Sequence, residues 1–200
     1  ILLAGFTGPT LGMECAGTVA AVGEGVAAFR PGDRVFGIAP AALASMALTR
    51  AEALAPLPPG LDPVAAATTP VAFLTALLAL EELARLEPGE RVLVHGGAGA
   101  VGLAALQVAL ARGAVVATTA GTEARRAFLR GAGAALVLDS RDPGFADALR
   151  AAWGGGEAGC VDVVLNSLNG EAMERSLGLL RPFGRFVELY PQFFAAAPTA

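Results

Sequence analysis

The chain has 200 residues, of which 54% are hydrophobic and 16% are charged, and its formal net charge is −4. This composition is typical of a compact globular chain and excludes an intrinsically disordered one. The absence of a basic cluster argues against nucleic acid as a partner, and no apolar run of membrane-spanning length is free of Gly, Pro and charge. The opening "ILLAGFTGPT" lacks a signal-peptide pattern, and without an initiator Met we expect the chain to begin within a longer polypeptide.

The first part of the chain, from 11 to 57, contains short apolar runs separated by turn residues. The runs are "CAGTVAAVG", "FRPGDRVFGI", "ALASMALT" and "LAPLPPGL". Val and Thr alternating with small residues predict short β-strands of a partly open barrel. From 62 to 86 the pattern becomes helical, with Pro63 and Pro70 near the expected helix starts.

From 91 onward, strand-like and helix-like segments alternate. The expected strands are "RVLVH", "AVVATT", "ALVLD", "VDVVLNS" and "GRFVEL", and the expected helices lie near 101–112, 123–131, 144–153 and 171–180. Near-continuous apolar strands joined by helices predict an α/β fold with a doubly wound parallel sheet, covered on both faces. We therefore expect part of a barrel-like, mainly β substrate domain over 1–86, including a linking helix. A nucleotide-binding domain over 87–200, truncated at its C-terminal end, would follow.

Three glycines follow the first of these strands and precede its helix. Gly97, Gly99 and Gly102 satisfy the G-x-G-x-x-G pattern of a dinucleotide-binding (Rossmann) domain. Gly97 would permit the tight turn, Gly99 would let the backbone approach a pyrophosphate, and Gly102 would let the helix pack closely against the sheet. The helix would present its unpaired N–H groups to the phosphates. The alternative is a glycine-rich turn that binds nothing.

The second strand ends in "ATTAGT", without the acid that commonly holds the ribose 2′-hydroxyl of NAD. Thr122, Arg125 and Arg126 follow, although the chain contains no lysine. A hydroxyl and forked guanidinium donors suit a 2′-phosphate, so we predict NADPH as the cofactor. The alternative is a solvated arginine pair on the second helix. Glu123 would oppose a phosphate there unless it caps the helix start.

Metal and acid–base chemistry have few candidates. Cys15, Cys160 and His95 are the only residues of their kinds, and they cannot form a Cys₄ or Cys₂His₂ zinc site. We expect two buried free thiols and no metal. His95 could act as a general acid, but a ring packed beside the phosphates and hydrogen-bonded to backbone is the favoured interpretation.

Five segments together resemble one known family. In chain order "LGMECAGTVAAVG", "FRPGDRVFGI", "TTPVAFLTALLAL", "VLVHGGAGAVG" and "VDVVLNSLNGE" resemble the medium-chain dehydrogenase/reductase superfamily. "NSLNGE" and "PVAFLTA" are most similar to enoyl reductase domains of modular type I polyketide synthases. The resemblance covers residues 11 to about 189. It implies a cytoplasmic, zinc-independent enzyme that uses NADPH to reduce an α,β-unsaturated thioester on an acyl carrier protein, beside neighbouring synthase domains.

The resemblance also implies a set of cofactor-binding positions. Thr75 would lie on the linking helix, facing the nicotinamide unless it is an ordinary core threonine. Asn166 and Ser167 would end a parallel strand at its carboxyl edge, where ligands of such sheets lie. The full set is Thr75, Gly97, Gly99, Ala100, Val101, Gly102, Thr122, Arg125, Asn166, Ser167 and Leu168.

One local departure from the family concerns the proton donor. After "GRFVEL" the family has Gly-Lys-x-Asp, whose lysine is a candidate donor, whereas this chain has "YPQFF". Tyr190 is the candidate in its place, against a purely structural role for that segment. Two alternatives to the enoyl reductase therefore stay open: a catalytically silent relative that keeps the fold, and a free-standing, zinc-free quinone oxidoreductase.

Overall fold

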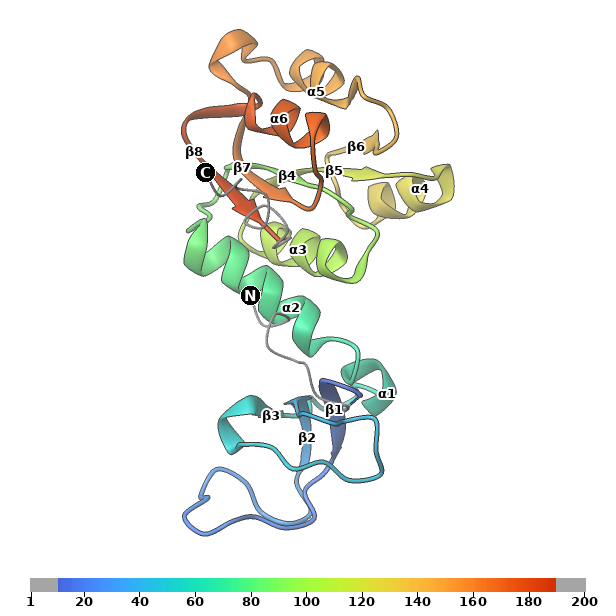
Figure 1. The fold of residues 1–200 in the computed structure, drawn as a ribbon, viewed down its shortest axis with the longest axis vertical. Coiled ribbons are helices and arrows are strands. Elements are labelled where there is room, and N and C mark those ends of the chain that lie inside the picture. The colour runs from blue at the N-terminus through green and yellow to red at the C-terminus, as the bar shows by residue number, and fades with distance from the viewer. Residues whose placement is uncertain (1–10, 190–200) are drawn as a thin grey trace, which may run out of the picture. The chain divides into compact units, whose positions relative to one another are not determined.

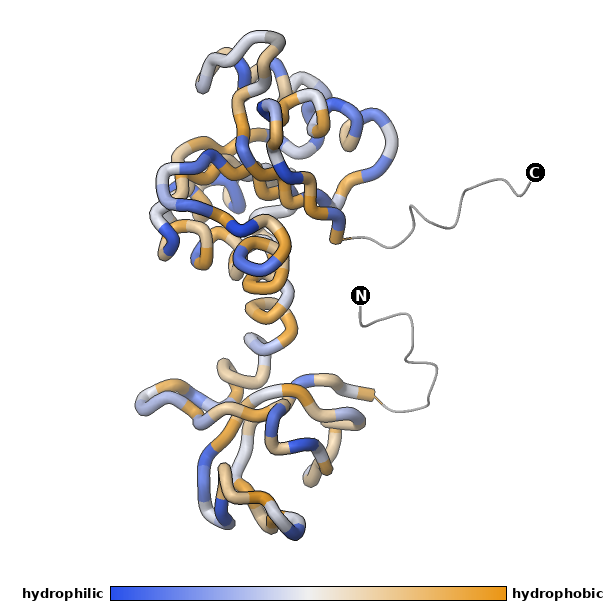
Figure 2. Tube along the Cα trace, turned by 90° about the vertical axis from the view of Figure 1, so that its left-hand side faces the viewer, coloured by the Kyte–Doolittle hydropathy of each residue, from blue (hydrophilic) through white to orange (hydrophobic). Residues whose placement is uncertain are grey.

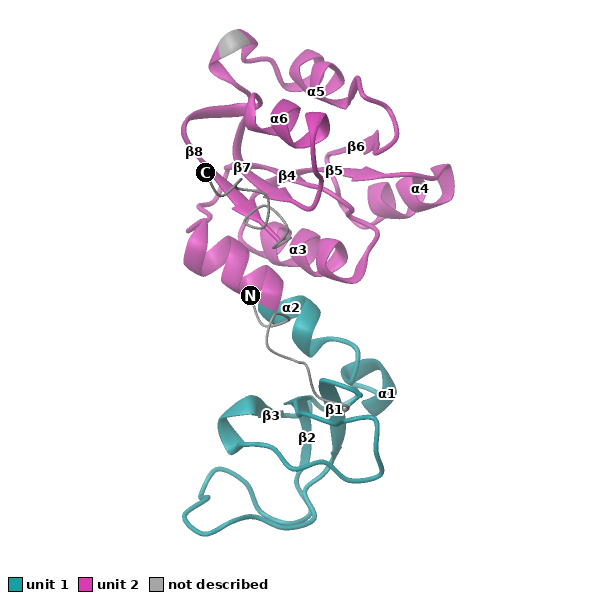
Figure 3. Cartoon of the chain, in the orientation of Figure 1, with its two compact units in different colours: residues 1–74 teal, residues 75–200 magenta. Residues whose placement is uncertain are grey.

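The computed structural model describes residues 11–189, and the chain divides into two compact units, residues 1–74 and 75–200 (Figure 3). The division falls inside helix α2 (Pro70–Leu77). The domain boundary expected after residue 86 stays a prediction. No helix among residues 11–189 is long and apolar enough to cross a membrane.

The first unit contains a three-stranded antiparallel sheet. Its strands are β1 (Glu14–Thr18), β2 (Arg34–Ile38) and β3 (Leu54–Pro56), in that order, and a 3-10 turn (Ala51–Ala53) precedes β3. Three of the four apolar runs therefore contribute a strand, in agreement with a mainly β domain.

The run "ALASMALT" is the exception, because it forms no strand. Leu43, Met46 and Leu48 are at least 74% exposed, and the backbone ladder between β2 and its neighbours does not include them. The hydroxyl of Thr49 donates to the carbonyl of Ile38 at 2.7 Å, which fixes one end of the run as a loop. The expected strand here was wrong because apolar residues form a stable strand only when a neighbouring strand pairs with them.

Helices lead from the first unit into the second. Asp62 accepts a hydrogen bond from the N–H of Ala65 at 3.0 Å and so caps α1 (Pro63–Ala66), with Pro63 in its first turn. Helix α2 begins at Pro70 and continues as a π-helical segment (Leu78–Leu83), and the tube is orange, hydrophobic, over most of this length in Figure 2. Both predicted helix starts are confirmed.

The second unit contains a five-stranded parallel sheet in the order β6-β5-β4-β7-β8. Helices α3 and α4 lie on one face and α5 and α6 on the other (Figure 1), which confirms the doubly wound fold. The strands are β4 (Arg91–Val94), β5 (Val115–Ala120), β6 (Leu136–Asp139), β7 (Val161–Asn166) and β8 (Leu180–Glu188). The helices are α3 (Ala100–Ala111), α4 (Glu123–Gly131), α5 (Phe145–Trp153) and α6 (Glu171–Leu177), and a 3-10 turn (Gly156–Ala158) precedes β7.

Helix α6 ends three residues before the predicted position. Gly178 caps its C-terminus, and the carbonyl of Leu179 accepts the N–H groups of Cys160 and Val161 at 2.8 and 3.1 Å. The chain therefore enters β8 at Leu180, because pairing with β7 satisfies backbone groups that another helical turn would have used.

One hydrophobic cluster of this unit lies between the sheet and α5 and α6, while Leu106 of α3 and Leu129 of α4 are buried on the other face. Leu93, Leu149 and Val164 are fully buried in this cluster, together with the free thiol of Cys160. The other free cysteine, Cys15, is only half-buried, so the expectation of two buried thiols was correct for one of them.

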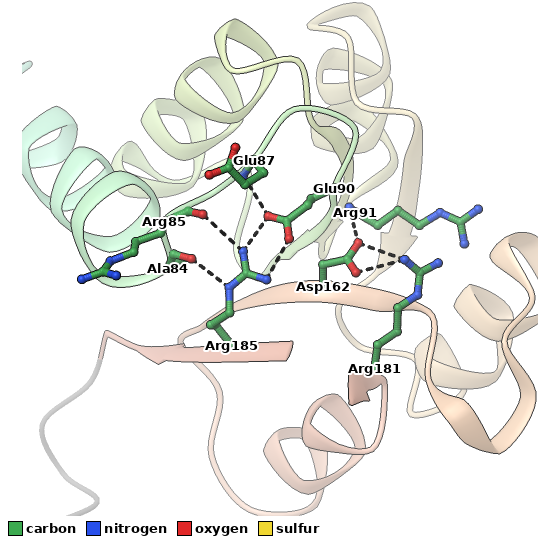
Figure 4. Close-up of polar contacts among 8 residues, drawn as sticks. All are labelled: Ala84, Arg85, Glu87, Glu90, Arg91, Asp162, Arg181 and Arg185. Carbon is green, nitrogen blue, oxygen red and sulfur yellow. Dashed lines mark hydrogen bonds and ion pairs between the residues drawn. The ribbon is translucent and has the colours of Figure 1, made fainter. Parts of the chain in front are cut away.

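Near the amino edge of the sheet, two arginines of β8 bind a carbonyl at the end of the linking helix and two carboxylates (Figure 4). Arg185 donates to the carbonyl of Ala84 at 2.8 Å and to both carboxylate oxygens of Glu90 at 2.8 and 2.5 Å. These bonds lower the pKa of Glu90 and raise the pKa of Arg185. Arg181 similarly holds Asp162 at 3.0 Å. The charged side chains at the amino edge therefore bind one another and the backbone.

Candidate dinucleotide-binding site

The glycine turn between β4 and α3 is packed too tightly to admit a side chain at Gly97 or Gly102. A Cβ at Gly97 would overlap the Thr118 side chain, and one at Gly102 would overlap the carbonyl oxygen of Gly96 and lie 2.6 Å from the Cα of Gly97. Gly96, with φ +65°, is the left-handed residue of the turn. The physical roles therefore differ in part from the expected ones, because Gly97 makes room for Thr118 and Gly96 makes the turn. Gly102 permits close packing, as expected, but against the turn rather than the sheet.

The N-terminus of α3 has backbone donors without acceptors. Gly99 is its N-cap and provides no side-chain cap, and the first N–H with an acceptor in the helix is that of Leu103, bonded to the Gly99 carbonyl at 2.9 Å. Within residues 11–189 the amides of Ala100, Val101 and Gly102 have no hydrogen-bond acceptor. Such amides and the positive end of the helix dipole attract phosphate, so this cradle fits the pyrophosphate of a dinucleotide.

The two adjacent arginines at the start of α4 have different surroundings. The Arg126 side chain is 17% exposed, pairs with Asp139 at 2.7 Å and with Glu123 at 3.0 Å, and donates to the carbonyl of Ala120 at 3.1 Å. Arg125 is exposed, and its guanidinium has no partner among the described residues. Only Arg125 therefore has its donors free for a ligand.

The polar residues around these arginines complete the local arrangement. Thr122 caps α4 by accepting the N–H of Arg125 at 3.4 Å, whereas Glu123 pairs with Arg126 and Arg130. Glu123 thus does not cap the helix, and its charge is neutralised by its neighbours instead. The pKa of Asp139 is lowered, first by the N–H of Arg141 and then by Arg126.

A further arginine, absent from the predicted set, lies at the same edge of the sheet. The Nε atom of Arg141 would be 3.2 Å from a Cβ at Gly121, and the hydroxyl of Ser140 would be 3.3 Å from it. The Arg141 side chain is exposed and makes no hydrogen bond or ion pair in the described part of the chain, although its charge helps to lower the pKa of Asp139. The available signal was its position two residues after the end of β6, since the carboxyl ends of parallel strands meet at one edge.

At the end of β7 the loop that follows is held by a buried amide. Asn166 is fully buried and donates to Glu188 at 2.6 Å and to the carbonyl of Leu168 at 2.8 Å, while its side-chain oxygen accepts the N–H of Leu168 at 3.2 Å. Both amide hydrogens are thus used within the fold. Ser167 is exposed, and its hydroxyl would be 3.6 Å from a Cβ at Gly96, so the loop and the glycine turn lie together as expected.

His95 is buried behind the turn, 3% exposed, with its ring edge against Phe145 at a centroid distance of 5.3 Å. Its Nδ1 lies 3.2 Å from the hydroxyl of Thr119 and its Nε2 lies 2.8 Å from that of Ser176. The prediction of a packed ring is confirmed, but its partners are side-chain hydroxyls rather than backbone. Burial lowers the pKa of His95 to about 4, so the ring is neutral at pH 7.

Two expected site residues remain, Thr75 and Tyr190. Thr75 is half-buried on α2 and its role toward a nicotinamide stays a prediction. Tyr190 lies outside the described residues. Within residues 11–189, no group of three or more His, Cys, Asp or Glu side chains is placed to hold a metal ion.

Comparison with known families divides the chain in the same way as the fold. Residues 4–59 match the alcohol dehydrogenase GroES-like domain, and residues 100–189 match the zinc-binding dehydrogenase family. Over 181 residues the chain is 44% identical to a phenolphthiocerol/phthiocerol polyketide synthase protein of Mycobacterium tuberculosis. That match covers 90% of this chain but only 8% of the synthase protein.

Solved structures show the same relationship. The CurK enoyl reductase is 43% identical with a TM-score of 0.82, over 90% of this chain and 53% of that one. A mycobacterial protein, Rv1454c, solved with NADPH, is 34% identical with a TM-score of 0.80, over 94% of this chain and 58% of that one. The nucleotide-binding subdomain of the PpsC enoylreductase domain from M. tuberculosis is 47% identical with a TM-score of 0.59, over 65% of this chain and 72% of that one. The chain therefore belongs to the medium-chain dehydrogenase/reductase superfamily, where it resembles the enoyl reductase domains of polyketide synthases.

Proposed function

We propose that this chain binds NADPH and takes part in the reduction of an α,β-unsaturated thioester carried on an acyl carrier protein. The observation that carries the cofactor assignment is the free guanidinium of Arg125, beside a strand that ends without an acid. The first amides of α3, which follow the glycine turn, also lack acceptors. The similarity to proteins named enoyl reductases supports the substrate class.

Different residues of the site would bind different parts of the cofactor. The amides of Ala100, Val101 and Gly102 would bind the pyrophosphate. The hydroxyl of Thr122 and the guanidinium of Arg125 would bind the 2′-phosphate, since forked, charge-assisted donors suit it best. The loop after Asn166 would orient the nicotinamide end, with Gly97 and Gly99 keeping the turn open to the phosphates.

When bound, NADPH would supply a hydride for the β-carbon of the enoyl group and leave as NADP⁺, and the α-carbon would take up a proton. The protein contributes orientation and water exclusion, as expected when the cofactor carries the reactive bond. Because the chain spans only a small part of the synthase protein that it matches, neighbouring synthase domains and an acyl carrier protein are the partners that we propose.

The chain spans 53% of the CurK enoyl reductase, and we expect it to be inactive on its own, so a turnover assay with the longer polypeptide that contains it tests this proposal. NADPH is mixed with a crotonyl thioester, and the nicotinamide absorbance is followed, with the saturated butyryl thioester as the matched control. We expect oxidation that depends on the crotonyl compound and is faster with NADPH than with NADH. Binding of NADPH without its oxidation would indicate the silent relative. Oxidation of NADPH with a quinone but not with the crotonyl thioester would indicate the quinone oxidoreductase.

A further inference from the structure

The only histidine of the chain is buried behind the glycine turn of the candidate site, between Thr119 of β5 and Ser176 of α6. We infer that His95 is a positioning residue: through Thr119 it holds the turn at Gly96 and Gly97 in the shape that receives the cofactor phosphates. This inference rests on the proposed binding of a dinucleotide. It assigns to His95 no contact with the cofactor or the substrate.

Thr119 of β5 holds the glycine turn at two points. Its hydroxyl oxygen accepts the N–H of Gly96 at 3.2 Å, and its carbonyl accepts the N–H of Gly97 at 3.0 Å. The Thr119 side chain is only 1% exposed, so water does not compete for these bonds. Gly96 therefore keeps its acceptor only while the Thr119 side chain holds its oxygen in this position.

The partners of the ring determine where every proton lies. Ser176 lies 2.7 Å from the carbonyl of Ala172, which can only accept, so the serine hydroxyl donates to it. The serine oxygen must then accept the N–H of His95 Nε2. In a neutral ring Nδ1 is left as an acceptor, and it takes the hydroxyl proton of Thr119.

The resulting chain of donors runs in one direction, from the N–H of Gly96 through Thr119, His95 and Ser176 to the carbonyl of Ala172. It connects the glycine turn to α6, the helix that follows the loop after Asn166. The groups that contact the ring are hydroxyls on β5 and α6 and the Phe145 ring on α5, and none is charged. Only the neutral ring with its proton on Nε2 lets each of the two hydroxyls donate one hydrogen bond and accept one.

The ring can be observed directly, because a single histidine makes its NMR signals unambiguous. We expect the ¹⁵N spectrum of the full chain at pH 7 to show a protonated Nε2 and an unprotonated Nδ1. We also expect saturating NADPH to shift the Nδ1 signal, although the cofactor would not touch the ring. The opposite tautomer, a charged ring, or unchanged signals under saturating NADPH would overturn the inference.

Two variants separate positioning from filling of space. His95→Asn keeps an oxygen where Nδ1 accepts from Thr119, whereas His95→Gln keeps an amide that reaches Ser176. We expect Asn to weaken NADPH binding by less than about threefold and Gln by about tenfold or more, as for a lost buried hydrogen bond. If the ring only filled space in the core, the smaller Asn side chain would weaken NADPH binding more than Gln.

A second pair tests the hydroxyl itself. Thr119→Ser keeps the hydroxyl and should keep NADPH affinity within about threefold, whereas the isosteric Thr119→Val should lose about tenfold. Circular dichroism identifies variants that fail to fold, and the NMR measurement needs no variant. Failure of the wild type to bind any dinucleotide would overturn the proposed function. Normal binding by the wild type with equal binding by Thr119→Val would overturn the positioning role alone.

Discussion

Replacing the two adjacent arginines of α4 one at a time should separate cofactor recognition from fold stability. Arg125 is exposed with its guanidinium unpaired among the described residues, whereas Arg126 is 17% exposed and bonded to the carbonyl of Ala120. We expect Arg125→Ala to lower NADPH affinity and leave the free energy of unfolding unchanged. Arg126→Ala should do the reverse.

The magnitudes follow from these surroundings. Arg126→Ala removes a largely buried stem and its bond to a backbone carbonyl, together worth about 1–2 kcal/mol of unfolding free energy. Its ion pairs with exposed carboxylates should add little. Arg125→Ala should change stability by less than about 0.5 kcal/mol, as for a free surface residue. Losing one charge-assisted bond to the 2′-phosphate should weaken NADPH about tenfold or more, with NADH nearly unchanged.

The assay is a titration with NADPH and NADH, following nicotinamide fluorescence at fixed salt because phosphate contacts are screened, together with urea unfolding of each variant. Arg130→Ala is the matched control: it removes the same charge from the same helix, and its guanidinium pairs with Glu123. Equal losses of NADPH preference in the Arg125 and Arg130 variants would show that the positive charge of the helix matters, rather than a specific contact by Arg125. A loss of preference in Arg126→Ala without loss of stability would refute the assignment.

Three other substitutions or conditions test the remaining features. Gly102→Ala places a Cβ against the Gly96 carbonyl, so we expect a loss of about 1–3 kcal/mol in unfolding free energy and of NADPH binding; a fully active variant would contradict the cradle. Arg141→Ala should reduce the NADPH-over-NADH preference with unchanged stability, whereas a loss for both cofactors would place Arg141 elsewhere in the site. Because the folded pKa of His95 is about 4, below its ordinary 6.5, its stabilisation is complete above pH 6.5 and is lost as pH falls towards 4. Urea unfolding should show a loss of about 2 kcal/mol between pH 7 and pH 5, which His95→Gln should largely remove.

The sequence by itself predicted the elements whose determinants are local. Helix α4 has the expected bounds because Thr122 caps its first turn and its apolar residues repeat with helical spacing. The five parallel strands were recognisable as apolar runs between helices. Gly102 was expected to permit close packing against the sheet, and it permits close packing against the turn instead. These features depend on residues within a few positions of one another.

The tertiary structure decided which of these residues meet. Ala120 pairs with Asp139 in the sheet, and this register brings the carboxylate to Arg126, leaving Arg125 free. Thr119 and Ser176 are 24 and 81 positions from His95, and only the parallel sheet and its crossover helices place them around one ring. Such contacts could not be predicted from the sequence, because burial and strand register, rather than local pattern, set which distant polar groups must satisfy one another.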